Sequence, residues 1–250
     1  RKIKPDLFVS CDGYMSLRTT IPTLAVIHDL NFEAFPDHLP SLFSKYYRYF
    51  FPKFARRAKR LATVSEFSKK DIVERYKVAA DKIDVVYNGV NELFQPLDEE
   101  SVSEVRSKHS AGQPYFLFVG SIHPRKNLFH QLQAFFEFRK RTNLNYKFLV
   151  VGSDFYGGSK IRRKVAESPY KEDVIFLGRQ NPQELRQLYG AAFALAYVSF
   201  FEGFGIPIVE AMRSGVPVIT SNTTSMPEVG GEAVLTADPG SVEEIANQMV

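Results

Sequence analysis

Residues 202–210 read Glu-Gly-Phe-Gly-Ile-Pro-Ile-Val-Glu, shortly after the apolar run Phe193-Ala-Leu-Ala-Tyr-Val198. A short, continuous apolar run is typical of a strand buried in a parallel sheet. Pro207 suits the first turn of a helix, so residues 203–205 are predicted to turn the chain from the strand into that helix. The stretch therefore predicts one β–turn–α unit of an α/β fold.

The start of this predicted helix is a candidate anion site. The first N–H groups of a helix, here near Gly205 and Ile206, have no partner within it, and the macrodipole favours negative charge, so a diphosphate fits there. Glu210 is predicted in the first turn, where its carboxylate can accept two hydrogen bonds from a vicinal diol such as that of a ribose. Glu202 is expected to face whatever lies beyond the phosphates. In the alternative interpretation, both glutamates only complement the helix dipole, an effect of about 0.3–1 kcal/mol each.

A second candidate phosphate loop follows the apolar run 115–119. Gly120 allows the backbone to pass close to a phosphate, and Lys126 supplies a cation at the start of the next predicted helix. Arg125 can add a planar, bidentate clamp. Two cations at a helix start oppose the macrodipole, which favours an anionic partner over a merely solvated pair.

Short apolar runs alternate with helical patterns along the chain, which predicts parallel α/β architecture. The predicted strands are 6–9, 23–27, 60–64, 82–86, 115–119, 146–151, 173–177, 194–198 and 217–220. The predicted helices are 41–58, 66–76, 127–141, 159–167, 182–190, 207–214 and 241–249. We predict a first domain over 1–90, a linker over 91–112 with at most one short helix, and a second domain over 113–250.

Five segments, taken in order, resemble the retaining glycosyltransferases of family 4, which have the GT-B architecture and transfer a sugar from a nucleotide diphosphate to an acceptor. They are Ile27-His-Asp-Leu30, Thr63-Val-Ser-Glu-Phe-Ser68, Tyr87-Asn-Gly-Val90, Tyr115-Phe-Leu-Phe-Val-Gly-Ser-Ile-His-Pro-Arg-Lys-Asn127, and Glu202 to Glu210 as an E-x7-E signature. The resemblance covers nearly the whole chain. It implies two Rossmann-like parallel-sheet domains that face each other across a cleft, the first of them incomplete.

The resemblance also implies roles for individual residues. The implied catalytic residues are His28, Arg125, Lys126 and Glu202. The implied donor-binding residues are Gly120, Ser121, Arg179, Gly203, Phe204, Gly205, Ile206 and Glu210. Many family members have an arginine where this chain has Ser121, so Arg125 is the expected substitute. A structural role stays open for His28, as for any lone histidine, and a plain surface position stays open for Arg179.

The implied function is retaining transfer of a hexose, with mannose slightly favoured, from a nucleotide-diphospho-sugar to a glycan or lipid-linked acceptor. The sequence has no Asp-x-Asp pair, the element by which many other glycosyltransferases hold a divalent cation on the diphosphate, so we expect no metal. The resemblance implies no cofactor either, since the nucleotide-diphospho-sugar is a substrate. Two other classes stay open. One is a GT-B sugar-nucleotide epimerase or a phosphorylase, which would need a pyridoxal-binding lysine. The other is a non-catalytic nucleotide-sugar-binding subunit, which would bind nucleotide without turnover.

The net charge of +4 comes from a basic excess in residues 1–90. Residues 41–60 combine basic and aromatic side chains with no acidic ones. Such a segment can form an amphipathic helix on an anionic membrane surface. In the alternative interpretation, it is a core helix whose aromatic side chains pack on the sheet while the basic ones stay solvated.

Composition excludes some classes of protein and indicates a location in the cell. The hydrophobic content of 44% supports packed cores, and no apolar run is long enough to span a membrane. The chain has no dense basic tract with interleaved aromatics, which argues against a nucleic-acid partner. The single Cys11 favours a reducing compartment, although it also fits a small exported protein. We expect a cytoplasmic protein, with the inner face of the membrane as the alternative location. The chain begins at Arg1 and ends within a predicted helix, which leads us to expect a fragment of a longer protein.

Overall fold

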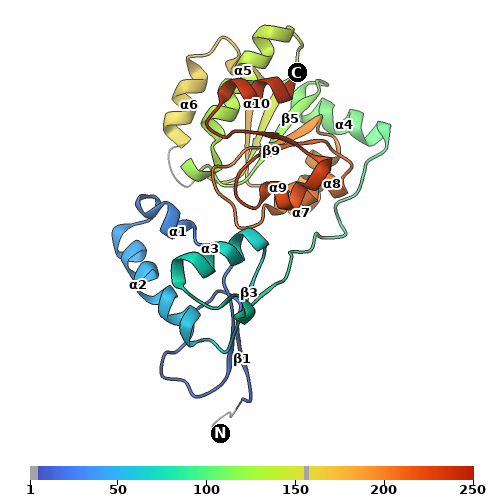
Figure 1. Ribbon diagram of the computed structural model, residues 1–250. Coiled ribbons are helices and arrows are strands. Elements are labelled where there is room, and N and C mark those ends of the chain that lie inside the picture. Colours follow the sequence, from blue (N-terminus) through green and yellow to red (C-terminus); the bar gives the residue numbers. More distant parts are fainter. Residues whose placement is uncertain (1–4, 155–157) are drawn as a thin grey trace. The chain divides into compact units, whose positions relative to one another are not determined.

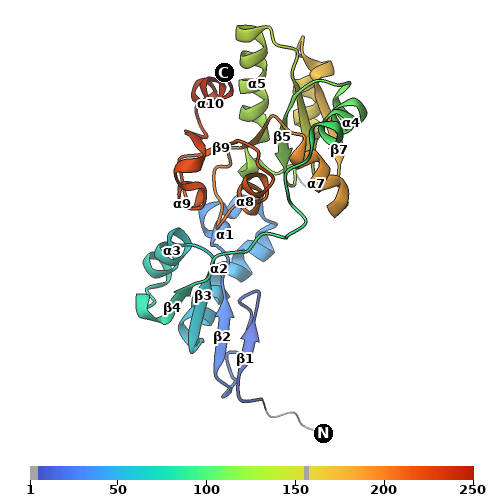
Figure 2. The ribbon, with the colours of Figure 1, turned by 90° about the vertical axis from the view of Figure 1, so that its right-hand side faces the viewer.

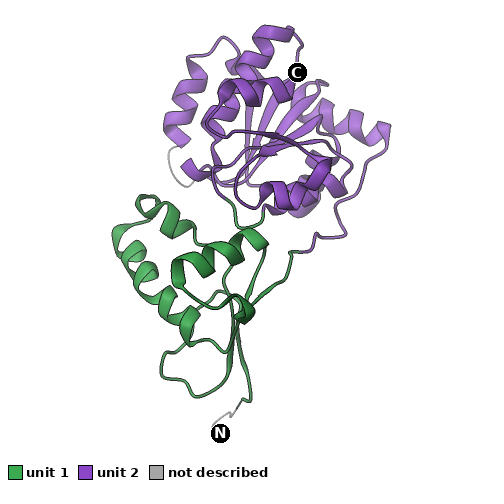
Figure 3. Ribbon diagram, in the orientation of Figure 1, with its two compact units in different colours: residues 1–88, 202–204 green, residues 89–201, 205–250 purple. Residues whose placement is uncertain are grey.

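A computed structural model describes residues 5–154 and 158–250, and the chain divides into two compact units. Unit 1 comprises the chain up to Asn88 together with Glu202–Phe204, and unit 2 comprises Gly89–Phe201 and Gly205–Val250 (Figure 3). The tripeptide 202–204 therefore packs with the first unit, although it belongs to a loop of the second half of the sequence. This division splits the segment from Glu202 to Glu210 between the two units.

Unit 1 is a four-stranded parallel sheet with the strand order β1-β2-β3-β4, visible as neighbouring arrows in Figure 2. Its strands are β1 (Phe8–Ser10), β2 (Thr23–Val26), β3 (Arg60–Thr63) and β4 (Ile83–Val85). Its helices, which lie on one side of the sheet in Figure 1, are α1 (Asn31–Ala34), α2 (Ser41–Arg57) and α3 (Glu66–Tyr76). Short 3-10 turns cover Pro36–His38 and Ala80–Lys82.

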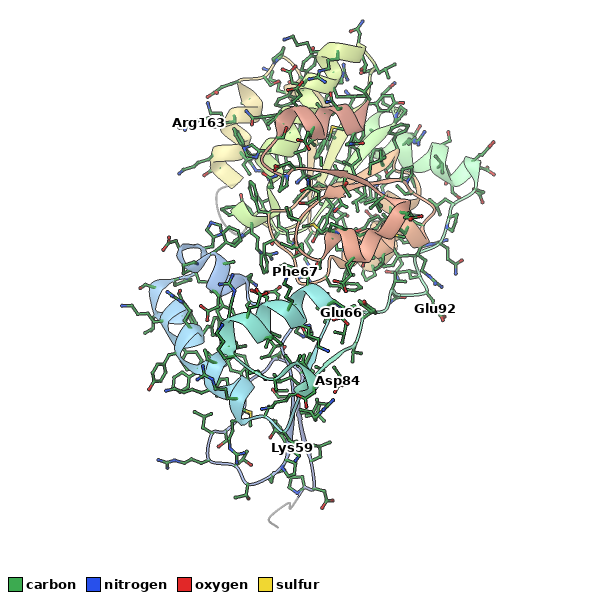
Figure 4. The ribbon with its side chains drawn as sticks, viewed as in Figure 1. Lys59, Glu66, Phe67, Asp84, Glu92 and Arg163 are labelled. Carbon is green, nitrogen blue, oxygen red and sulfur yellow. The ribbon has the colours of Figure 1, made fainter. Side chains whose placement is uncertain are left out.

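Local sequence explains the two long helices of unit 1. Ser65 caps α3, because its Oγ accepts a hydrogen bond from the N–H of Ser68 at 3.0 Å. Glu66 and Phe67 then stand in the first turn of α3 (Figure 4). Helix α2 buries Phe51 and Phe54 in the core, whereas its opposite face leaves apolar side chains in solvent. The core-helix interpretation of 41–60 therefore describes only one face of α2.

Unit 2 is a six-stranded parallel sheet with the order β10-β9-β8-β5-β6-β7. Its strands are β5 (Tyr115–Val119), β6 (Lys147–Val151), β7 (Val174–Gly178), β8 (Ala194–Tyr197), β9 (Val218–Ser221) and β10 (Leu235–Ala237). Its helices are α4 (Glu99–Ser110), α5 (Leu128–Thr142), α6 (Gly158–Ala166), α7 (Pro182–Gly190), α8 (Ile206–Arg213), α9 (Met226–Gly230) and α10 (Val242–Met249). Short 3-10 turns cover Pro124–Lys126, Lys171–Asp173 and Gly231–Ala233.

Helices cover both faces of the unit 2 sheet (Figures 1 and 2). Side chains of α5, α6 and α10 share one hydrophobic core with one face of the strands. Side chains of α4, α7, α8 and α9 share a second core with the other face. Burial on both faces explains why strand β5 is a continuous apolar run rather than an alternating one.

The structure confirms the predicted α/β class, with two parallel sheets. It also corrects the predicted elements. Helix α4 lies within the predicted linker 91–112, where at most one short helix was expected; it has twelve residues, and Val105 is buried in the unit 2 core. Three further elements, α1, α9 and β10, were not predicted, because each is too short for its periodicity to show.

Candidate functional site

The strand order of unit 2 reverses direction between β5 and β8, because the chain runs outward from β5 through β6 to β7 and then returns to β8. Ligands of open α/β sheets bind outside the carboxyl ends of the strands at such a switch point. The two loops that leave this point are Gly120–Asn127 after β5 and Val198–Phe201 after β8. Both contain or adjoin residues predicted as site residues.

Hydrogen bonds fasten these two loops to each other. The backbone N–H of Phe200 donates to the carbonyl of Arg125 at 2.9 Å, and Nη1 of Arg125 donates to the carbonyl of Phe201 at 2.5 Å. Buried Asn127 donates from Nδ2 to the carbonyls of Val198 and Pro239, at 2.9 and 2.7 Å. Part of the Arg125 guanidinium therefore holds the loop before Glu202. Its predicted role as a phosphate clamp stays a prediction.

Lys126 lies over Gly120 at the centre of this arrangement. A Cβ built on Gly120 would lie 3.7 Å from Cδ and Cε of Lys126. The lysine Nζ donates to Oη of Tyr197 at 2.6 Å, and Tyr197 is the buried last residue of β8. The hydroxyl of Tyr197 thereby holds the ammonium group at the carboxyl end of the sheet.

Helix α8 begins at the same edge of the sheet. Gly205 is its N-cap with φ of 100°, a left-handed conformation that favours glycine, and Pro207 lies in the first turn. A Cβ on Gly205 would lie 3.6 Å from Cε1 of Tyr197, which places the helix start beside the Lys126–Tyr197 pair. Ile206 is exposed at this start. A cation and a helix N-terminus thus adjoin each other, an arrangement that suits a diphosphate.

Glu210 lies one turn further into α8 than predicted. The helix begins at Ile206, and its first turn contains no acidic residue. Glu210 is half-buried, and its Oε2 accepts a hydrogen bond from Oη of Tyr189 at 2.8 Å. Burial raises the pKa of the Glu210 carboxyl, while the hydrogen bond from Tyr189 lowers it. The carboxylate is therefore held by a partner that was not predicted from the sequence.

Unit 1 contains four of the predicted residues, His28, Glu202, Gly203 and Phe204. His28 follows β2, and its Nε2 lies 3.0 Å from the carbonyl of Cys11. Gly203 packs against this loop so closely that a Cβ would lie 2.6 Å from the carbonyl oxygen of His28. The carbonyl of Gly203 accepts hydrogen bonds from Oγ of Ser65 at 2.6 Å and of Ser68 at 3.2 Å. Unit 1 therefore brings His28 together with the tripeptide 202–204.

The other two members of the tripeptide, Glu202 and Phe204, belong to unit 1 and are also buried. Glu202 is 6% exposed, a depth of burial that is rare for a carboxylate. The ring of Phe204 lies 6.1 Å from the ring of Tyr87, measured between centroids. The segments that resembled the family around 27–30, 63–68 and 87–90 therefore meet the segment that begins at Glu202.

For two predicted donor-binding residues, Ser121 and Arg179, the part of the chain that the structure describes shows no contact that supports the predicted role. Ser121 is half-buried in the loop after β5, where the next residue, Ile122, donates its N–H to the carbonyl of Ser153 at 2.9 Å. Arg179 is exposed and follows β7, the edge strand, so it lies two strands away from the β5–β8 switch point. Both roles stay predictions. Within 5–154 and 158–250, no group of three or more His, Cys, Asp or Glu side chains is placed to hold a metal ion.

Several supporting residues were not predicted from the sequence. They are Tyr189, Tyr197, Asn127, Gln131 and His123. Gln131 Oε1 accepts the N–H of Val198 at 3.3 Å, and His123 Nδ1 accepts the N–H of Arg125 at 3.2 Å. One feature of the sequence could have indicated these five residues. Each has a polar side chain in or near a predicted strand or helix, where a buried polar group needs a hydrogen-bond partner.

Models of known families match both halves of the chain. Residues 101–249 match the model of the glycosyl transferases group 1, and residues 1–92 match that of glycosyltransferase family 4. The chain belongs to the glycosyl transferases group 1 family. The resemblance found in the sequence is thereby confirmed.

Two curated relatives are bacterial mannosyltransferases. The chain is 33% identical over 224 residues to O-antigen chain mannosyltransferase B of Escherichia coli, an alignment of 89% of this chain. It is also 33% identical over 227 residues, or 88% of this chain, to the O-antigen chain mannosyltransferase RfbU of Salmonella typhimurium. The chain spans 59% of the length of each of these relatives.

Solved structures share the fold at lower identity. HepE of Anabaena, solved with UDP and glucose, has a TM-score of 0.77 and 22% identity, covering 90% of this chain and 60% of HepE. WaaG, a glycosyltransferase involved in lipopolysaccharide biosynthesis, has a TM-score of 0.72 and 18% identity, covering 91% of this chain and 67% of WaaG. These matches confirm the predicted GT-B fold class. The placement of two domains across a cleft stays a prediction.

Proposed function

We propose that this protein transfers a hexose, with mannose favoured, from a nucleotide-diphospho-sugar to a glycan, with retention of anomeric configuration. The observation that carries the proposal is that Lys126 and the start of α8, the helix that contains Glu210, lie together at the switch point of unit 2. The mannose preference is supported by the two mannosyltransferase relatives. The comparisons do not favour the epimerase, phosphorylase or non-catalytic alternatives.

In this proposal, the residues of unit 2 bind the nucleotide end of the donor. Lys126 and the N–H groups at the start of α8 neutralise the charge that develops on the diphosphate as the glycosidic bond breaks. The carboxylate of Glu210 accepts hydrogen bonds from a ribose diol. Because donors fixed in place supply this stabilisation, we propose that transfer requires no divalent cation.

The residues of unit 1 act on the transferred sugar in this proposal. Glu202 accepts hydrogen bonds from the sugar hydroxyls, and His28 faces the sugar beside it. The close contact of Gly203 with the carbonyl of His28 and the side chain of Asp29 supports this pairing, because it fixes the position of the neighbouring glutamate. The hydroxyls of Ser65 and Ser68 hold the same loop through its carbonyl.

A transfer assay with the complete protein tests the proposal. We expect turnover of a guanosine- or uridine-diphospho-hexose, with a product of unchanged anomeric configuration by NMR. We also expect the rate in excess EDTA to be close to the rate with added magnesium. Loss of activity on chelation that magnesium restores would contradict the electrostatic argument. Nucleotide binding without any transfer would favour the non-catalytic subunit.

We further propose that the exposed face of α2 contacts an anionic membrane surface, so that a lipid-linked acceptor is within reach. This face carries Leu42, Phe43 and Tyr49, which are 76%, 55% and 60% exposed. Lys45 is exposed on the same side, and Nζ of Lys53 lies 3.2 Å from the ring centroid of Tyr49. Apolar and basic groups on one helix face suit the interface of an anionic bilayer. Within the described ranges, no helix is long and apolar enough to span a membrane.

Vesicle co-sedimentation tests this contact. Replacing Lys45 and Lys53 with Gln is expected to weaken binding to anionic vesicles at low salt by about 1 kcal/mol per charge. The matched control replaces Lys160 and Arg163 of α6, where Arg163 projects outward (Figure 4), and should leave binding unchanged. If the wild-type protein does not sediment with anionic vesicles at low ionic strength, the membrane proposal is wrong.

A further inference from the structure

Tyr189 is a fully buried tyrosine whose hydroxyl contacts a predicted ligand-binding residue. It lies in the last turn of α7, and its Oη donates to Oε2 of Glu210 at 2.8 Å. The resemblance to the family assigned no role to this position. A buried hydroxyl normally has a hydrogen-bond partner, but here the partner is the carboxylate expected to accept a sugar diol.

Packing fixes the ring of Tyr189. The ring of Phe94 meets it edge to face, with centroids 5.4 Å apart and planes at 89°. The neighbouring Gly190 lies so close to Leu97 that a Cβ on the glycine would come within 2.5 Å of the leucine Cγ. Because both neighbours belong to the segment before α4, that segment locks the end of α7 in place. The tyrosine hydroxyl therefore has little freedom to turn away from Glu210.

Tyr189 remains a hydrogen-bond donor throughout the physiological range. Burial, followed by the nearby Glu210 carboxylate, raises the pKa of the Tyr189 hydroxyl well above its ordinary value. The phenol thus stays neutral. Donation to one carboxylate oxygen of Glu210 leaves the other oxygen to accept hydrogen bonds from a ligand.

We propose that Tyr189 is a positioning residue that holds the Glu210 carboxylate, oriented and ionised, to receive the diol of a bound nucleotide. The inference rests on the proposed function, since it concerns the preparation of the same site. Without the hydroxyl, the carboxylate would lose the hydrogen bond that fixes its orientation and would turn among several rotamers.

Burial raises the pKa of the Glu210 carboxyl, and the hydrogen bond from Tyr189 lowers it. The role of Tyr189 can therefore be tested by measuring how Glu210 titrates with pH. The elements packed against α8 are α7, α9, β8 and β9. Their titratable side chains, with that of α8 itself, are Glu184, Arg186, Tyr189, Tyr197, Glu228 and Arg213. Among these groups, it is Tyr189 that lowers the pKa of Glu210. Removing the hydroxyl should therefore raise that pKa further.

The first measurement needs no ligand. In protein with ¹³C-labelled glutamate carboxyls, the Glu210 signal, assigned with Glu210→Gln, should titrate above the ordinary pKa of a glutamate. In Tyr189→Phe it should titrate at a still higher pH. Tyr115→Phe is the matched control, because its fully buried hydroxyl donates to the carbonyl of Leu188 at 2.7 Å in the same core and does not contact Glu210. Identical titration of Glu210 in wild type, Tyr189→Phe and Tyr115→Phe would overturn the proposal.

The second measurement is titration of guanosine or uridine diphosphate across pH. Affinity should fall as pH decreases through the pKa of Glu210, because the protonated carboxyl accepts poorly. In Tyr189→Phe, affinity at neutral pH should be about tenfold lower, the usual consequence of losing a hydrogen bond to a charged group, and the fall should begin at higher pH. Tyr115→Phe should bind like wild type. If wild type binds and Tyr189→Phe matches it at every pH, the inference fails. If wild type binds neither nucleotide, the proposed function fails, and the carboxyl titration still decides the role of Tyr189.

Discussion

Replacing Lys126 with alanine is expected to lower kcat of sugar transfer by about 10²–10³-fold, or about 2.7–4 kcal/mol of transition-state stabilisation. The ammonium group is fixed by Tyr197 beside the start of α8, where the charge of a departing diphosphate would develop. Because this charge is greater in the transition state than in the bound donor, kcat should fall more than KM rises. Steady-state kinetics of transfer would measure both.

The matched control for this prediction is Lys140→Ala. Lys140 is an exposed lysine in the last turn of α5, within the same unit. Its replacement removes an equal charge away from the switch point and should leave kcat unchanged. Thermal unfolding of both variants would show whether either substitution disturbs the fold. An equal loss of kcat in the two variants would mean that Lys126 acts only through the general charge of the protein.

Most of the fold could be predicted because each long element carries its own local signal. Strand β5 and helices α3 and α7 have the predicted boundaries. Each is an apolar run or is delimited by a capping residue such as Ser65 or Asn181. Strand β10 has three residues and α9 has five, so neither spans enough of a period to be distinguished from a loop. Helix α4 was underestimated because its sequence is mostly polar and exposes most of its surface.

The candidate site could be predicted only in outline. Glycines and charged residues after predicted strands indicated which loops matter, because loops at one end of a parallel sheet converge. The partners of these residues could not be predicted, since they are far away in the sequence. Arg125 holds Phe201, and Lys126 contacts Tyr197, across separations of 76 and 71 residues. Their roles toward a ligand stay predictions.

Gly203 was predicted as a site residue, but the physical reason for a glycine at this position differs from the one that the sequence suggested. The sequence suggested that it serves a tight turn into α8. In the structure, a Cβ at this position would lie 2.6 Å from the carbonyl oxygen of His28 and equally close to Cβ of Asp29, so any side chain would collide with both. The glycine is therefore required by close packing within unit 1. No sequence pattern could reveal that contact, because residues 28 and 203 are joined only by the fold.

We propose that Glu210, in the helix that begins at the switch point of unit 2, binds the sugar of a nucleotide. Replacing Glu210 with alanine is expected to weaken nucleoside diphosphate binding by about 2–3 kcal/mol, because charged hydrogen bonds to the diol are lost. In Glu210→Gln the side-chain amide oxygen can still accept the hydrogen bond from Tyr189, and the side chain keeps its size. Weaker nucleotide binding by this variant would therefore be due to the lost negative charge and not to lost packing. Glu232→Ala, at an exposed carboxylate of the same unit, is the control and should bind normally.

Calorimetric titration of guanosine and uridine diphosphate into wild type, Glu210→Ala, Glu210→Gln and Glu232→Ala is therefore the most direct test. We predict measurable binding of at least one nucleotide by wild type and Glu232→Ala. We also predict at least a tenfold loss of that affinity in Glu210→Ala, which corresponds to about 1.4 kcal/mol or more. Equal affinities in all four proteins would contradict the assignment of Glu210 and, with it, the proposed location of the donor site.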